Sequence, residues 1–381
     1  MHADQYTWLP TGGWSPALPP AAAPSVQLVL AYGPVDAPPP EWFDALRAVW
    51  PAARLVYVSG GGQIAGATVQ DDATVVCAIT FRRTRVTAVA TDGSGPDDAE
   101  ALGRRIGEAF SYVDALRHVL VFTEGLSLNG SAFVRGLHGA LPSHVGVSGG
   151  LASDGVSFAR SCVGLDGPPA PDRIVAVGLS GDALVVGTGS EGGWQVFGPD
   201  RLVTRASGVL VHELDGERAL DVYRRYLGPF ADELPGSALL FPLALGHTVG
   251  EAPIVRTILG IDEATGALRF AGEVPEGRHV RLMRSDADQL LDGAAEAAVR
   301  ARRSHDGAVP PVVALCFSCI GRRAVLRSRT EEELEEVQQV LGDAVLAGFY
   351  SNGEIGPHGH DDVDYPILHN QTMTITTLAE R

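Results

Sequence analysis

The chain has 381 residues, of which 45% are hydrophobic and 20% are charged, an ordinary composition for a globular protein with buried cores. Its 29 basic residues are outnumbered by 46 acidic ones, for a formal net charge of −17. A charge of this sign repels nucleic-acid phosphates and anionic lipid surfaces, so neither is expected as a partner. Every basic residue is an arginine, which excludes chemistry that depends on lysine, such as a Walker A phosphate site or a Schiff base.

The cysteines and the N-terminal segment indicate a cellular compartment. Cys77, Cys162, Cys316 and Cys319 are too few and too scattered for a disulfide framework, and free cysteines in apolar runs fit a reducing environment. Residues 1–24 lack the basic and apolar regions of a signal peptide, and no later segment has eighteen uninterrupted apolar residues. The sequence therefore predicts a cytoplasmic protein with a flexible segment over residues 1–24.

The first predicted elements follow the order strand, helix, strand, glycine loop and two further strands. They cover residues 26–33, 41–50, 55–58, 60–62, 74–81 and 85–90. Apolar runs bounded by glycine or proline predict the strands, and apolar residues at helical spacing behind Pro40 predict the helix. In the middle of the chain, two apolar runs at 173–180 and 183–188 surround Ser180-Gly181-Asp182, which is typical of a hairpin turn. An amphipathic helix is predicted over 215–227, and an Ala-rich helix is predicted over roughly 286–303.

The opening order of elements returns at the C-terminal end. A strand over 312–317 is followed by a helix in which Thr330 and Glu333 match a capping box and Gly342 marks the end. Aligning Gly62-Gln63-Ile64 with Gly353-Glu354-Ile355 superposes the preceding helices without a gap. A fainter third copy runs from Val119–Phe122 to Val145–Gly150. Repeated strand–helix–strand units with Gly-rich loops at strand ends predict a mixed α/β fold.

Two motifs match patterns found in enzymes, but the residues that follow each motif do not fit the pattern. Gly187–Gly192 matches a dinucleotide-binding pattern, but the residues after it do not begin a helix, so a connection within a sheet is expected. Ser148 lies in a Gly-x-Ser-x-Gly pattern, with Asp154 or Asp215 and then His369 downstream in the order of a hydrolase triad. The turn-like residues after Ser148 argue against the nucleophile elbow, so a serine hydrolase is the weakest of the functional hypotheses.

Two further patterns have metal or redox spacing. Cys316 and Cys319 are separated as in redox or zinc motifs, yet they lie in a strand-like run without a second ligand pair, so packing is expected. The histidines and aspartates of 358–362 offer metal ligands, but a polar segment of this kind is typically a solvated loop. No metal site is predicted.

Several motifs resemble those of the FIST family, sensory proteins of intracellular signal transduction. The C-terminal motifs are Ser-Cys-Ile-Gly-Arg-Arg at 318–323, Glu-Glu-Leu at 332–334, Gly-Phe-Tyr at 348–350, Gly-Glu-Ile-Gly at 353–356 and Leu-His-Asn-Gln-Thr-Met-Thr at 368–374. The N-terminal motifs lie at 149–155, 203–206, 213–216 and 219–223. The resemblance implies a FIST N domain over 25–228 and a FIST C domain over 229–381, with the boundary in the Pro- and Gly-containing stretch 228–237.

The resemblance also implies a function. It is that of a non-catalytic sensory protein that binds an amino acid or a similar small polar ligand and signals in trans to a partner such as a histidine kinase. The alternative taken from the family is a haem-binding nitric-oxide sensor that regulates a histidine kinase, although the eleven histidines show no diagnostic spacing.

The polar residues of these motifs support ligand binding more than catalysis. Arg322 and Glu354 offer opposite charges for a zwitterion, and the side chains of Tyr350, Asn370 and Gln371 offer neutral donors and acceptors. Arg323, next to Arg322, is a further candidate for a carboxylate. The full set of predicted ligand-binding residues is Arg322, Tyr350, Glu354, Asn370, Gln371, Cys319, Gly150 and Asp154.

Overall fold

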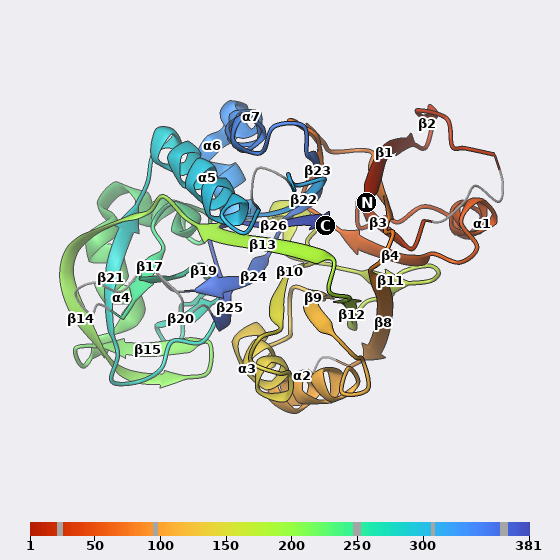
Figure 1. Cartoon of the computed structure of the whole chain (residues 1–381). Helices are drawn as coiled ribbons and strands as arrows, with labels where there is room; N and C mark the ends of the chain where they lie inside the picture. The colour runs from red at the N-terminus through yellow and green to blue at the C-terminus, as the bar shows by residue number, and fades with distance from the viewer. Residues whose placement is uncertain (21–25, 94–97, 247–252, 306–308, 359–364) are drawn as a thin grey trace.

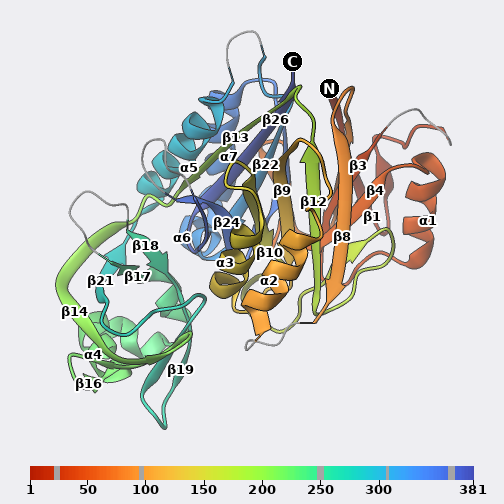
Figure 2. The same cartoon turned by 60° about the horizontal axis from the view of Figure 1, so that its bottom comes forward.

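The structure is a computed structural model that describes residues 1–20, 26–93, 98–246, 253–305, 309–358 and 365–381. Three six-stranded sheets pack their inner faces together, with helices on the outside, and an eight-stranded sheet lies to one side (Figure 1 and Figure 2). This arrangement confirms the predicted mixed α/β class. Within the described residues, no helix is both long and apolar enough to cross a bilayer.

Each six-stranded sheet has a parallel pair of strands at its centre. The pairs are β3 (Leu28–Gly33) with β4 (Arg54–Ser59), β9 (Leu116–Thr123) with β10 (Gly146–Leu151), and β22 (Val313–Cys319) with β23 (Val345–Ser351). Because parallel strands need a crossover connection, helices join them: α1 (Pro40–Val49), α3 (Gly130–Ala140), and α6 (Ile320–Leu326) with α7 (Thr330–Leu341). The three units predicted from the sequence are therefore present.

Two antiparallel strands extend each parallel pair on one side. They are β7 (Thr74–Thr80) and β1 (His2–Leu9), β12 (Arg173–Ser180) and β8 (Arg85–Asp92), and β26 (Met373–Glu380) and β13 (Leu184–Glu191). The short strand β2 (Gly13–Ser15) pairs with β1. This corrects the prediction of a flexible segment over 1–24, because residues 2–15 contain two strands of the first sheet.

On the other side, each sheet is completed by strands that follow the second parallel strand of a different unit. Strands β5 (Gln63–Ala65) and β6 (Thr68–Gln70) follow β4 but extend the sheet of β23. Strands β24 (Gly353–His358) and β25 (Tyr365–His369) follow β23 but extend the sheet of β10. Strand β11 (Val163–Leu165) follows β10 and pairs with β4, which closes the cycle.

The registers agree with the sequence alignment of the repeats. Gln63 is opposite Phe349, and Glu354 is opposite Gly150, so Gln63 and Glu354 occupy corresponding places in two sheets. The exchange of strands links the three units, because no unit completes its own sheet.

Aromatic side chains at corresponding positions fill the central core. Tyr32, Phe122 and Phe317 come from the first parallel strand of the three units. The ring centroids of Tyr32 and Phe122 are 6.4 Å apart and those of Phe122 and Phe317 are 5.7 Å apart. Phe349 enters the same cluster, with centroids 5.4 Å from Tyr32. A Cβ atom at Gly150 would lie 3.0 Å from the Phe349 Cζ atom, so a glycine there leaves room for the ring.

The outer helices bury their apolar faces on these sheets. Helix α1 packs Trp42, Phe43, Leu46 and Val49 on the first sheet, α2 (Ala99–Glu108) and α3 cover the second, and α5 (Ala287–Arg302) and α7 cover the third. A Cβ atom at Gly187 would lie 1.8 Å from the Ala301 carbonyl oxygen, and one at Gly189 would lie 2.1 Å from that of Ala297. The glycines of the dinucleotide-like pattern therefore lie in β13, where they allow α5 to approach, as expected for a connection within a sheet.

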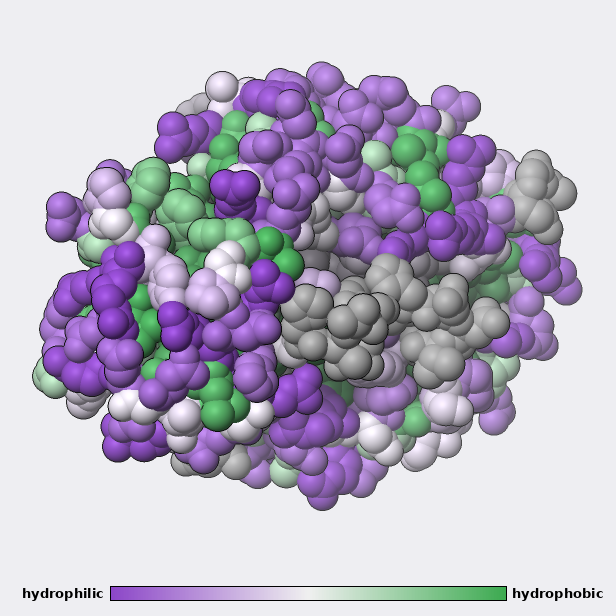
Figure 3. Space-filling view, turned by 90° about the vertical axis from the view of Figure 1, so that its left-hand side faces the viewer, coloured by the Kyte–Doolittle hydropathy of each residue, from purple (hydrophilic) through white to green (hydrophobic). Residues whose placement is uncertain are grey.

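Residues 195–284 form the eight-stranded unit, which is inserted between β13 and α5. Its elements are β14 (Gln195–Ser207), β15 (Leu210–Leu214), β16 (Glu217–Arg218), α4 (Ala219–Leu227), two 3₁₀ helices, η3 (Gly228–Glu233) and η4 (Gly236–Leu240), β17 (Leu243–Leu245), β18 (Ile254–Arg256), β19 (Ile258–Asp262), β20 (Ala267–Phe270) and β21 (His279–Arg284). It has its own hydrophobic core. Figure 3 shows the face of the molecule that includes the eight-stranded unit, where hydrophobic residues form small groups among hydrophilic ones. The predicted boundary at 228/229 falls within this unit.

Two local predictions were wrong. Strands β12 and β13, expected to form a hairpin, belong to different sheets, because β12 pairs with β8 and β9 while β13 pairs with β26. Glu333 does not form a capping box with Thr330; it turns inward instead, and the Thr330 hydroxyl donates to the Arg327 carbonyl oxygen. In both cases a tertiary contact replaces the local one.

Candidate functional site

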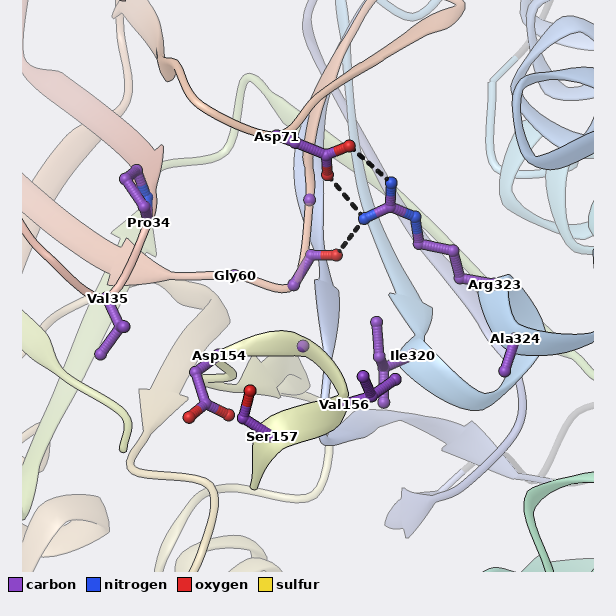
Figure 4. Close-up of a pocket in the computed structure, with 13 residues that line it drawn as sticks. Pro34, Val35, Gly60, Asp71, Asp154, Val156, Ser157, Ile320, Arg323 and Ala324 are labelled. Atoms are coloured by element: carbon purple, nitrogen blue, oxygen red, sulfur yellow. Dashed lines mark hydrogen bonds and ion pairs between the residues drawn. The ribbon is translucent and has the colours of Figure 1, made fainter. Parts of the chain in front are cut away.

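A cleft of about 480 Å³ opens where loops from all three units meet (Figure 4). It lies beyond the carboxyl ends of β3, β4, β10 and β22, and the carboxyl ends of strands are where α/β sheets commonly bind ligands. Its walls are Pro34 and Val35, the glycine loop 60–62, Asp71, residues 154–157, Ile320, Arg323 and Ala324. Of these residues, Asp154 was predicted to bind the ligand, and Arg323 was a further candidate for a carboxylate.

The glycines at 60–62 allow the three units to come close together. A Cβ atom at Gly61 would lie 2.8 Å from both the Gly155 Cα and the Ile320 Cδ1 atoms. Gly62 has a φ of 131°, which L side chains rarely adopt. The backbone N–H of Gly61 donates to the Tyr350 carbonyl oxygen at 2.8 Å. Larger residues would therefore push apart the loops that form the cleft.

Arg323 provides the positive charge of the cleft. Its Nη1 and Nη2 atoms donate to the two carboxylate oxygens of Asp71 at 2.7 and 2.9 Å, and Nη1 also donates to the Gly61 carbonyl oxygen. The guanidinium lies 5.5 Å from the centroid of the Tyr350 ring. The hydrogen bonds with Asp71 raise the pKa of Arg323. The Arg323 side chain is 26% exposed, so a solute can reach it.

Asp154 provides a negative charge on the opposite wall (Figure 4). Its Oδ2 atom accepts the backbone N–H groups of Ala159 and Arg160 at 3.0 and 2.8 Å. Its Oδ1 atom is buried and has no hydrogen-bond partner among the described residues. A buried acceptor without a donor costs free energy, so this oxygen favours a ligand that brings a donor.

Arg322, which was predicted to bind the ligand, is fully buried in a separate polar cluster. Its Nε and Nη2 atoms donate to one Glu333 oxygen at 3.1 and 2.9 Å, and its remaining donors bind the carbonyl oxygens of Gly192 and Leu290. The other Glu333 oxygen accepts the Tyr350 hydroxyl at 2.7 Å. Burial, together with the Glu333 carboxylate, raises the pKa of Tyr350 well above its ordinary value.

Glu354 is buried in a second cluster near the start of α6. One of its oxygens accepts the Ser351 hydroxyl at 2.5 Å, and the other accepts the backbone N–H and the hydroxyl of Thr372 at 3.1 and 2.9 Å. Burial raises the pKa of Glu354 to about 7. Burial also raises the pKa of the Cys319 thiol, which is 3% exposed.

Asn370 and Gln371 connect the three-sheet core to the eight-stranded unit. The Asn370 Oδ1 atom accepts the backbone N–H of Thr257 at 3.4 Å, and the Gln371 Nε2 atom donates to the Leu239 carbonyl oxygen at 3.0 Å. Gln371 has a φ of 64°, an uncommon conformation for a residue other than glycine. The motif at 368–374 therefore lies where the three-sheet core contacts the eight-stranded unit.

The structure thus brings some predicted residues together and separates others. Arg322, Tyr350, Cys319 and Glu354 gather around the start of α6, but all four are buried. Gly150 lies in the aromatic core, and Asp154 is the only one of the eight that lines the cleft, where Arg323, the further candidate, also lies. Ligand contact by any of the eight remains a prediction. Sequence reasoning missed Asp71, because it reaches Arg323 from 252 positions away.

The serine and cysteine motifs of the sequence lie in buried strands. Ser148 lies within β10 and is fully buried, where its hydroxyl contacts the His118 Nε2 and Thr376 Oγ1 atoms at 2.7 and 2.6 Å. Cys316 and Cys319 are buried free thiols of β22, as expected for packing. Of residues 358–362, only His358 lies in the part of the chain that the structure describes. In that part, no three histidine, cysteine, aspartate or glutamate side chains are grouped so that they could hold a metal ion.

Within the described residues, the cleft and two of the other cavities offer haem no axial histidine, whereas a further cavity of about 480 Å³ is lined by His305. No histidine is among the described residues that line the cleft or the two cavities of about 590 and 490 Å³. The buried histidines His118 and His369 are hydrogen-bonded to Ser148 and to the Pro357 carbonyl oxygen. An axial histidine is thus not available at these sites.

Two solved structures resemble this chain weakly. A cyanuric acid hydrolase is 10% identical, with a TM-score of 0.34, and the match covers 100% of this chain and 99% of that one. The PurLQS structure from Thermotoga maritima is 8% identical, with a TM-score of 0.22 over 84% of this chain and 74% of that one. Scores this low support no statement about fold or chemistry.

Sequence comparisons are more informative. An uncharacterized protein of Mycobacterium tuberculosis is 29% identical over 269 residues, which is 68% of each chain. An uncharacterized protein of Mycobacterium bovis is 31% identical over 178 residues, 43% of this chain and 44% of its own length. The model of the FIST N domain matches residues 27–217, and that of the FIST C domain matches residues 219–357. The chain therefore belongs to the FIST family, whose domains are sensory domains of signal transduction.

Proposed function

We propose that this protein is a non-catalytic sensor that binds a small zwitterion, such as an amino acid, in the cleft between the three units. The observation that carries the proposal is the pair of opposite charges on facing walls. Arg323 can receive a carboxylate bidentately, and the Asp154 Oδ1 atom lacks a donor. A ligand that carries both a carboxylate and an ammonium group satisfies both walls.

The surroundings of the cleft support binding more than catalysis. Its volume of about 480 Å³ is within the usual range for small-molecule sites, about 300 to 1,000 Å³. No serine, cysteine or histidine with an activating partner is among the described residues that line it, since Ser157 is its only lining residue of these types. The Ser148 hydroxyl is buried within a strand, so it lacks the exposure that a nucleophile requires.

Signalling to a partner protein in trans is the expected output, with a histidine kinase as the expected class of partner. The cleft is formed by loops of all three units, so a ligand there changes the contacts between them. Such a change alters the population of conformations that a partner can recognise.

The proposal is tested by titration calorimetry of the purified protein with each of the twenty standard amino acids. We expect at least one to bind, and we expect Arg323→Gln and Asp154→Asn each to weaken that binding about tenfold or more, because a charge-assisted contact is lost. The variant Asp154→Asn keeps an oxygen for the N–H groups of Ala159 and Arg160.

The matched control is Arg329→Gln. Arg329 pairs with Asp288 and Glu332 on the surface and does not line the cleft. Its substitution removes the same charge and should leave the affinity unchanged. Equal losses in the control and in Arg323→Gln, or binding by no amino acid, would contradict the proposal.

A further inference from the structure

A second cavity, of about 490 Å³, lies between the three-sheet core and the eight-stranded unit. On the core side it is lined by the β9–α3 loop, residues 125–129, with Leu151 and Asn352. On the other side it is lined by the β14–β15 turn and by residues of β19–β20, including Arg269 and Phe270. It shares no lining residue with the cleft of the proposed function.

The core wall of this cavity is held rigid by a buried carboxylate. Glu124 is 2% exposed. Its oxygens accept the backbone N–H groups of Leu126, Ser127 and Leu128, as well as the Ser127 hydroxyl. Several N–H donors on one carboxylate fix the loop conformation, so this wall does not depend on a ligand for its shape.

The two walls are also held at a set separation. The Glu273 carboxylate of the eight-stranded unit accepts from the Asn129 Nδ2 atom at 2.8 Å and from the Arg135 Nη1 atom at 3.1 Å. The buried Arg256 side chain donates to the Leu368 carbonyl oxygen of the core at 3.1 Å. The cavity is therefore preformed, as ligand sites usually are.

The polar groups of the cavity are already engaged, with one exception. Asn129 binds Glu273, and Asn352 binds Ser153 and the Gly125 carbonyl oxygen. Arg269 is the only charged side chain among the described residues that line the cavity, and its guanidinium has no hydrogen bond or ion pair within the described part of the chain. Large apolar residues also line the cavity: Leu126, Leu128, Leu151, Leu210, Leu259 and Phe270.

We propose that this cavity is a second binding site, for a small organic monoanion with an apolar body. The carboxylate of the ligand pairs with Arg269, which is exposed to solvent, and the apolar part of the ligand lies against the leucines and Phe270. The two sites differ in charge. The cleft carries both signs, whereas this cavity carries one cation and no acid among its described lining residues. A ligand here contacts both the core and the eight-stranded unit, so it stabilises one relative placement of the two.

The test uses phenylacetate as the probe and phenylacetamide as its neutral counterpart of the same shape. Titration calorimetry of the full chain should show phenylacetate binding, with phenylacetamide about tenfold or more weaker, because the amide cannot form the charged contact. Arg269→Gln should weaken phenylacetate to the level of the amide, and Arg269→Lys should retain part of the preference for the anion.

Two control variants locate the site. Arg281→Gln removes a cation from the same unit, where Arg281 binds the Gly198 carbonyl oxygen away from the cavity, and it should leave the affinity unchanged. Arg323→Gln should also leave phenylacetate binding unchanged, which separates this site from the cleft. Equal binding of acid and amide, an unchanged affinity in Arg269→Gln, or no binding of phenylacetate to the wild-type chain overturns the proposal.

Discussion

Substitution of Asp71 by asparagine should tighten ligand binding in the cleft. Asp71 holds the guanidinium of Arg323 with two hydrogen bonds, and its side chain is 61% exposed. A ligand carboxylate competes with Asp71 for the Nη1 and Nη2 donors of Arg323. Exposed ion pairs contribute roughly 0.2 to 1 kcal/mol, with bidentate pairs toward the upper end. Removal of the competing charge should therefore raise the affinity by up to about fivefold.

The assay is titration calorimetry with whichever amino acid binds the wild-type protein, at low and at high salt. The gain should shrink at high salt, because the competing pair is exposed and is already screened there. Asp288→Asn is the matched control, since Asp288 pairs with Arg329 outside the cleft. An unchanged or weaker affinity in Asp71→Asn would refute the idea that Asp71 occupies the place of the ligand carboxylate.

Three further predictions concern the buried polar groups and the core. Arg322→Met leaves the Glu333 carboxylate buried without its cation, and we expect a loss of about 3 to 5 kcal/mol in the free energy of unfolding in urea. Burial raises the pKa of Glu354 in the folded protein to about 7, above its value in the unfolded chain. Protonation of Glu354 therefore stabilises the folded state, and this stabilisation is complete below the unfolded pKa. That contribution is lost as the pH rises toward 7, by up to about 3 kcal/mol, and Glu354→Gln should lack this loss. Gly150→Ala places a methyl group against Phe349 and should cost about 1 to 3 kcal/mol.

Each of these predictions has a distinct control. A second substitution, Glu333→Gln, should recover part of the loss in Arg322→Met, because no charge then remains buried. For Glu354, wild-type and variant unfolding curves are compared at pH 4.5 and pH 7.5, and parallel changes in the two proteins would contradict the assignment. For Gly150, Phe349→Leu in the same chain should relieve the crowding; an additive loss would show that the ring is not the obstacle.

Much of the fold was predictable because its signals are local. Apolar runs that end in glycine marked β3, β4 and β23, and the helical spacing of Trp42, Phe43, Leu46 and Val49 marked α1. The correspondence of Gln63 with Glu354 could also be predicted from the sequence, because each residue directly follows a glycine and comes at the same distance after a strand.

The errors arose where a local pattern competed with a distant partner. Turn chemistry at Ser180-Gly181-Asp182 favours a hairpin, but β12 and β13 each find neighbours in a different sheet. Glu333 has the right spacing for a capping box, yet it pairs with Arg322, which would otherwise be a buried and uncompensated charge. Predicting such contacts requires knowledge of the packing.

The amino-acid sequence by itself determined the repeated strand–helix–strand units, the Gly-rich loops and the membership of the FIST family, because periodicity, glycine placement and motifs are written along the chain. Only the tertiary structure decided that Arg322 is buried while its neighbour Arg323 faces the cleft, and that Asp71 and Asp154 both line that cleft. The physical reason is the cyclic exchange of strands, which brings together loops that are far apart in sequence and leaves their spacing without a local signal.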